Sequence, residues 1–157
     1  YLTHRRLYTS PFTEESFRRV LIDLSQVCID NKLQLIYRGR LGDPLSVWVN
    51  ENANRLNIAV AKGTSLQEDF DQVEVVTGVF TTALHEAVLY NKKIVPINYL
   101  NDYDQRGFDK IFGDLYVKNK EQLYARFEAL VGQSNHDDQF FDLHNKYFCN
   151  NARKPTF

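Results

Sequence analysis

Residues 73–96 read VEVVTGVFTTALHEAVLYNKKIVP, and this stretch decides the predicted fold. Val73–Thr77 is a short, nearly continuous apolar run, which is typical of a buried strand. Thr81–Tyr90 carries apolar residues at helical spacing, and Lys93–Ile97 is a second apolar run of strand length. The stretch therefore predicts a strand, a crossover helix and a second strand parallel to the first.

The same alternation continues toward the N-terminus. An amphipathic helix is predicted behind Thr13 as N-cap, and a further helix opens at Thr64 or Ser65, both of which have capping-box spacing. Two short apolar runs read as strands, and one segment is ambiguous between loop and helix. In chain order the segments are helix Pro11–Asp30, strand Leu33–Arg38, the ambiguous Pro44–Leu56 and strand Asn57–Ala61.

Toward the C-terminus, Asn98–Gly113 reads as a polar and aromatic loop, and Leu115–Val117 as an edge strand. Lys120–Val131 and Asp137–Cys149 are predicted helices. Short apolar strands that alternate with helical crossovers favour a parallel sheet covered on both faces. We therefore expect one α/β domain over residues 1–157, with a doubly wound, Rossmann-like sheet and extra C-terminal helices.

Composition narrows the function classes. The chain has 157 residues, 43% of them hydrophobic, and a net charge of -1, which gives no general reason to bind nucleic acid. No apolar run approaches the roughly 20 residues of a membrane span. Cys28 and Cys149 lie far apart without metal-ligand spacing, which suits a reducing compartment. We therefore expect a cytoplasmic protein. The absence of Met, together with a start on Tyr1, predicts that the chain is a fragment of a larger two-domain protein.

The turn after the Val73–Thr77 strand carries the candidate ligand-binding residues. Gly78 permits a tight turn, and the hydroxyls and amides of Thr81 and Thr82 are placed to meet a phosphate. Glu86 follows Thr82 by one helical turn, so its carboxylate can accept hydrogen bonds from ribose hydroxyls on the same face. This pattern predicts a nucleotide-phosphate site.

Residues 77–87 (TGVFTTALHEA) and 91–96 (NKKIVP) resemble the donor-binding half of GT-B glycosyltransferases. The likeness is to bacterial capsule, lipooligosaccharide and teichoic-acid-type transferases and to the epimerases that share their fold, and it covers roughly Phe12–Asn98. The resemblance implies that Thr81 and Thr82 hold the donor phosphates and that Glu86 binds the ribose. It also implies that the loop Lys62–Thr64, with Gly63 at its centre, lies near the base.

The chain departs from these families after its first predicted strand. Related enzymes often carry Lys/Arg-x-His-Pro there, whereas this chain has Arg38-Gly39-Arg40-Leu41. No catalytic histidine can be assigned, so the catalytic residues stay unknown. Two guanidiniums, Arg38 and Arg40, can still clamp a phosphate bidentately.

The implied function is transfer of a sugar, or of a related phosphorylated group, from a nucleotide-activated donor to an acceptor glycan in surface polysaccharide synthesis. The nucleotide sugar is a substrate, and no cofactor or metal is implied. The missing N-terminal domain is a further partner, so the isolated chain is expected to be inactive, and the full-length protein is expected at the inner face of the membrane. The alternatives are half of a nucleotide-sugar epimerase, or a non-enzymatic doubly wound binding or regulatory module.

Structural interpretations compete for the same residues. Thr81 and Thr82 are good helix caps in many proteins, Glu86 and His85 can be surface residues, and Arg38 with Arg40 can pair with Asp43 at a strand end. The remaining candidates are weaker. Three of them, Asp102, Asp104 and Arg106, lie in the loop after the Pro96 strand, and the other histidines, His4, His136 and His144, show no metal-ligand spacing.

Overall fold

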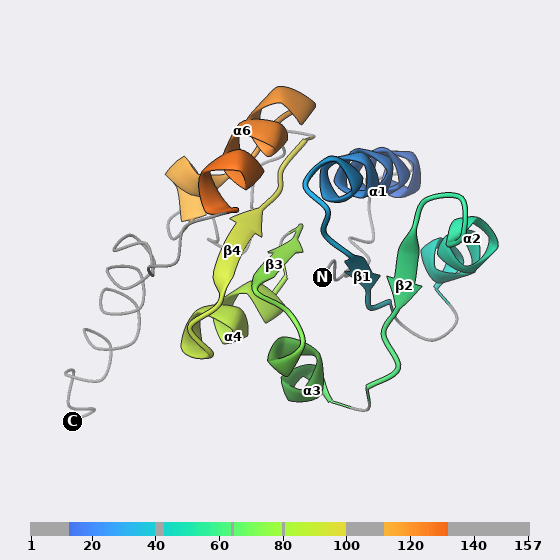
Figure 1. The fold of residues 1–157 in the computed structure, drawn as a ribbon, viewed down its shortest axis with the longest axis horizontal. Helices are drawn as coiled ribbons and strands as arrows, with labels where there is room; N and C mark the ends of the chain where they lie inside the picture. Colours follow the sequence, from blue (N-terminus) through green and yellow to red (C-terminus); the bar gives the residue numbers. More distant parts are fainter. Residues whose placement is uncertain (1–12, 40–42, 64, 80, 100–111, 132–157) are drawn as a thin grey trace.

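Two pairs of parallel strands form the centre of the molecule (Figure 1). The computed structural model describes residues 13–39, 43–63, 65–79, 81–99 and 112–131. One pair joins β1 (Leu35–Tyr37) to β2 (Ile58–Val60), and the other joins β3 (Val75–Gly78) to β4 (Lys93–Pro96). A single parallel bridge between Ile97 and Val117 extends the second pair. The predicted α/β class with parallel strands is confirmed.

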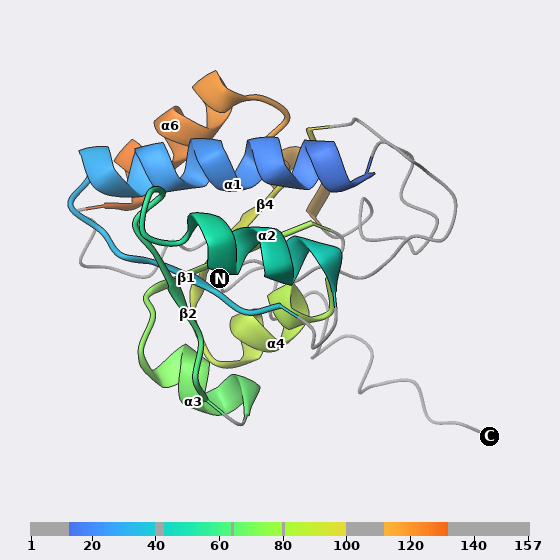
Figure 2. The same cartoon turned by 90° about the vertical axis from the view of Figure 1, so that its right-hand side faces the viewer.

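Helices lie on both sides of the strands. In Figures 1 and 2, α1 (Thr13–Asp30) and α6 (Lys120–Leu130) lie on one side, and α3 (Leu66–Asp71) and α4 (Ala83–Leu89) lie on the other. The helix α2 (Pro44–Asn52) contacts α1 and β2, and a short 3₁₀ helix η1 (Gly113–Leu115) precedes α6. Among the helices described, none has the length and apolar character needed to cross a membrane.

Capping explains why the ambiguous segment after β1 is helical. Asp43 is the N-cap of α2, where its Oδ1 accepts a hydrogen bond from the Leu45 amide at 3.1 Å, and Pro44 occupies the first turn. At the start of α3 the N-cap is Ser65, whose hydroxyl accepts from the Glu68 amide at 3.2 Å. The helix start predicted at Ser65 is therefore confirmed, and Thr64, the alternative start, lies outside the described residues.

Each described helix-to-strand turn after α1, α2 and α4 uses a residue with a left-handed backbone. These residues are Lys32 with φ 56°, Asn57 with φ 50° and Asn91 with φ 56°. Asn tolerates this conformation better than most residues, and a left-handed residue commonly ends a helix. After α4, the amides of Asn91 and Lys92 donate to carbonyls of the last helical turn at 3.0 and 2.9 Å. The chain thus turns directly from α4 into β4.

The one continuous sheet expected from the sequence is not present between the described strands, because β1 and β3 share no strand pairing. A cavity of about 270 Å³ is lined by residues of both strands. Apolar side chains of α1, β1, β3 and α6 line it, among them Cys28, Leu35, Val75 and Phe127. Burial raises the pKa of the Cys28 thiol, as expected for a core position.

Two other predictions differ in detail. The edge strand expected over Leu115–Val117 reduces to the single bridge at Val117, because Leu115 belongs to η1. The helix Lys120–Val131 is confirmed as α6, which Asn119 caps by accepting from the Gln122 amide at 2.8 Å. The predicted helix Asp137–Cys149 lies outside the described residues.

Candidate functional site

The turn after β3 is shaped by two buried threonines. The Thr77 hydroxyl donates to the Val95 carbonyl at 2.8 Å, which fastens the end of β3 to β4. The Thr81 hydroxyl accepts from the Ala83 amide at 3.2 Å, and only 7% of Thr81 is exposed. Gly78 is also buried, at the end of β3 opposite Pro96. Gly78 and Thr81 therefore hold the turn, and the capping role considered for Thr81 is confirmed.

Thr82 and Glu86 lie on the surface, one helical turn apart. Both residues are exposed, and Thr82 makes no side-chain capping bond. The Glu86 amide donates to the Thr82 carbonyl at 3.2 Å, which places the two side chains on one face of α4. Both side chains were predicted to bind ligand, and the structure places them next to each other and open to solvent.

The backbone amides at the start of α4 are already used. The Ala83 amide donates to Thr81 Oγ1, and those of Leu84, His85 and Glu86 donate to carbonyls of Thr81 and Thr82. These four amides are therefore not available for the hydrogen bonds to a phosphate that the sequence predicts at the start of this helix. Since α4 has only 7 residues, its dipole is also short, and ligand binding here would depend on side chains.

Arg38 is the centre of a second group, which we call the Arg38 cluster: Arg38, Gly63, Ser65 and Asp69. The Arg38 Nε pairs with the Asp69 carboxylate, and its Nη2 donates to the carbonyls of Gly63 at 2.8 Å and Ser65 at 3.0 Å. The guanidinium thus ties the end of β1 to the loop between β2 and α3. Its ion-pair partner is Asp69, whereas the candidate partner Asp43 caps α2.

Gly63 has a steric reason to be glycine. A Cβ atom added there would lie 2.8 Å from the Asp69 Oδ1 and 3.2 Å from the Glu68 Oε2. The loop that the sequence assigns to the nucleotide base therefore lies against the Arg38–Asp69 pair. Arg40, the second predicted phosphate clamp, lies outside the described residues.

The remaining candidates are placed only in part. His85 is half-buried on α4, and its ring centroid lies 5.1 Å from that of Phe112, so it packs against the segment before η1. The loop candidates Asp102, Asp104 and Arg106, and the histidines His4, His136 and His144, lie outside the described residues. Within the described ranges, no three His, Cys, Asp or Glu side chains are grouped as a metal site requires.

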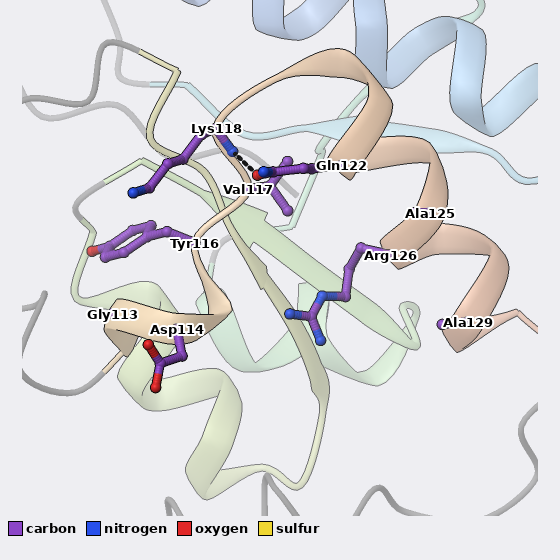
Figure 3. A pocket seen from close by; sticks show the side chains of 9 residues that line it. All are labelled: Gly113, Asp114, Tyr116, Val117, Lys118, Gln122, Ala125, Arg126 and Ala129. Carbon is purple, nitrogen blue, oxygen red and sulfur yellow. Dashed lines mark hydrogen bonds between the residues drawn. The ribbon is translucent and has the colours of Figure 1, made fainter.

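A groove of about 510 Å³ along α6 was not predicted from the sequence (Figure 3). It runs between the Gly113–Lys118 segment and the α6 face that carries Gln122 and Arg126. The Lys118 amide donates to Gln122 Oε1 at 2.9 Å across one end. Its residues are ordinary members of an amphipathic helix and its preceding loop, so their sequence pattern carries no ligand signal.

No family model, no curated protein and no solved structure matches the chain.

Proposed function

We propose that the chain is the nucleotide-donor-binding domain of a GT-B-like glycosyltransferase of doubly wound, Rossmann-like architecture. The observation that supports this proposal best is the unit formed by β3, α4 and β4. The stretch with the family resemblance forms a parallel strand–helix–strand unit, and it exposes Thr82 and Glu86 together beyond the carboxyl end of β3. Ligands of parallel α/β folds bind at this end of the strands.

The side chains suggest a division of roles. The Thr82 hydroxyl donates to a donor phosphate oxygen, and the Glu86 carboxylate accepts hydrogen bonds from the ribose hydroxyls. Gly78 and Thr81 act indirectly, because they hold the turn that presents Thr82. In the same way, Arg38 fixes the loop at Gly63 beside the base.

The Rossmann-like part of the proposal concerns the order of the strands. With β1 beside β3, the four strands would follow the order β2-β1-β3-β4. Residues of both β1 and β3 line the cavity of about 270 Å³, which supports this order. The loops after β1, β2 and β3 would then meet at one edge, where a bound nucleotide reaches all three.

The proposed reaction moves a sugar, or a related phosphorylated group, from a nucleotide-activated donor to an acceptor glycan of a surface polysaccharide. Negative charge develops on the leaving phosphate, and preorganised donors stabilise it. The acceptor and the general base would come from an N-terminal partner domain, and the whole enzyme would act in the cytoplasm at the inner face of the membrane.

The test is calorimetric titration of the chain with UDP, CDP, GDP and CMP. One nucleotide should bind. T82A and E86A should each weaken its binding by about 2- to 10-fold, because this is the change in affinity expected for the loss of one or two hydrogen bonds. E128A is the matched control, because Glu128 is an exposed helical glutamate on α6. Absence of binding by all four nucleotides, or equal losses in E86A and E128A, would contradict the proposal.

A further inference from the structure

A second hollow, which we call the α1–α6 pocket, lies between the first half of α1 and the start of α6. Its volume is about 470 Å³. Figures 1 and 2 show α1 and α6 on the same side of the strands. The pocket is lined by Ser16, Arg19, Asp23, Tyr99, Lys118 and Lys120, with Asn119 between the two lysines.

The chain topology brings these residues to the carboxyl end of the strands. Ile97 and Val117 form a parallel bridge, so the segments that follow them leave the sheet at the same edge. Tyr99 follows the first partner by two residues, and Lys118 follows the second directly. Because ligands of parallel α/β folds bind at this edge, the pocket has the position of a site rather than of a chance surface depression.

The described lining of the pocket carries a net positive charge, although the chain as a whole has a net charge of -1. Among the described residues that line it, three cations, Arg19, Lys118 and Lys120, face one carboxylate, that of Asp23. Asp23 is 9% exposed, accepts a hydrogen bond from the Tyr99 hydroxyl at 3.1 Å and lies 3.8 Å from the Lys120 Nζ. The mutual repulsion of three cations is unfavourable, and an anion between them would relieve it.

The backbone that carries the lysines is fixed before any ligand arrives. Asn119 Oδ1 accepts from the Gln122 amide at 2.8 Å, and Gln122 Oε1 accepts from the Lys118 amide at 2.9 Å. These two bonds, one to the N-cap Asn119 and one from the residue before it, set the direction of the chain through Lys118–Lys120. On the opposite wall, the Tyr99–Asp23 hydrogen bond fixes the position of the Asp23 carboxylate. The pocket therefore needs little reorganisation to bind.

We propose that the α1–α6 pocket binds the phosphoryl group of a phosphorylated ligand, at a position distinct from the Thr82–Glu86 face. Arg19 offers a planar guanidinium that can engage two phosphate oxygens, while the lysines supply mobile point charges. The Ser16 hydroxyl adds a neutral donor. This assignment does not depend on the nucleotide proposal, because it involves a different set of residues and a different pair of helices.

The experiment is an NMR titration of the ¹⁵N-labelled chain with pyrophosphate. Amide shifts are expected at Lys118, Asn119 and Lys120, and the K118Q/K120Q double variant should weaken binding by about tenfold or more. K92Q is the control, because Lys92 precedes β4 at the opposite end of the strands. Its affinity should stay within about twofold of the unchanged chain, as expected for a distant charge screened by salt.

A variant that removes negative charge from the pocket provides the opposite test. D23N removes the one carboxylate among the described residues that line the pocket and keeps an oxygen that can accept from Tyr99, so it should strengthen pyrophosphate binding by about two- to fivefold. A purely structural role of the Asp23–Lys120 pair would change thermal stability in D23N and leave the affinity unchanged. That result would overturn the proposal.

Two further outcomes separate this site from the proposed donor site. If pyrophosphate shifts the amides of Thr81–Ala83 and not those of Lys118–Lys120, the α1–α6 pocket proposal is wrong while the donor-site proposal stands. If K92Q weakens binding as much as K118Q/K120Q, the attraction is non-specific and the assignment also fails. Should the double variant not fold, R19Q alone carries the test, with folding checked by circular dichroism.

Discussion

Replacement of Asp69 by Asn tests whether the Arg38 cluster stabilises the fold. The Asp69 side chain is 5% exposed and its partner Arg38 is 23% exposed. Loss of one partner from a fully buried pair costs about 3–5 kcal/mol, and loss from an exposed pair costs about 0–1 kcal/mol. Asn keeps the shape of the side chain, and Arg38 keeps its bonds to two backbone carbonyls. We therefore expect D69N to lower the free energy of unfolding by about 2 kcal/mol.

The assay is urea unfolding followed by circular dichroism, with thermal melts in parallel. For a chain of this size, a loss of about 2 kcal/mol corresponds to a fall in Tm of about 4–8 °C. The matched control is E14Q, because Glu14 and Arg18 form an ion pair whose side chains are 45% and 41% exposed. Screening by solvent limits the cost of E14Q to about 0.5 kcal/mol.

A double-mutant cycle with R38M isolates the pair itself. The coupling energy between D69N and R38M should be about 1–2 kcal/mol, because each single variant leaves the other partner without its counter-charge. The reasoning is refuted if D69N costs no more than E14Q, or if the coupling energy is zero within error. Either result would mean that solvent screens the Arg38 guanidinium despite its partial burial.

The other predictions concern the turn after β3, the end of β1 and the pocket tyrosine. T81A should lose about 1 kcal/mol in urea unfolding because it removes a buried cap, whereas T82A should stay within about 0.5 kcal/mol. A Cβ at Gly39 would lie 2.6 Å from the buried Tyr37 ring. G39A should therefore cost about 1–3 kcal/mol, and an unchanged Tm would contradict this packing. Burial, and then a neighbouring carboxylate, raise the pKa of Tyr99 above its ordinary value of 10.0. The unfolded chain then loses this proton first as pH rises, so stability should fall above about pH 10, and less steeply in Y99F.

Local patterns in the sequence predicted most of the described elements, because each depends on neighbouring residues. The strand, helix and strand of residues 73–96 appear as β3, α4 and β4, each within two residues of the predicted bounds. The segment after Asp43 stayed ambiguous, since its helix has few inward apolar residues and depends on one capping carboxylate. Such a cap is visible in the sequence but is also common in turns.

Long-range contacts were beyond sequence reasoning. Asp69 reads as an ordinary acidic residue in the first turn of α3, and its partner lies 31 positions earlier in the chain. The α1–α6 pocket likewise joins Arg19 to Lys118 across most of the domain. Spacing rules describe neighbours on one helix or strand, so they cannot pair residues that only the tertiary fold brings together.

The two strand pairs share no ladder among the described residues, so side chains must hold them in one unit. Hydrogen bonds tie α1 to the second half of the chain at its middle and at its C-terminal end, from Tyr99 to Asp23 at 3.1 Å and from Tyr124 to Asp30 at 2.9 Å. The Arg38 cluster makes a third connection, from β1 to the helix that leads into β3. The loops after β1, β2 and β3 keep their relative positions only while these contacts persist. Nucleotide binding at Thr82 and Glu86 would therefore depend on residues that touch no ligand, and D69N should weaken it even though Asp69 lies in a different helix.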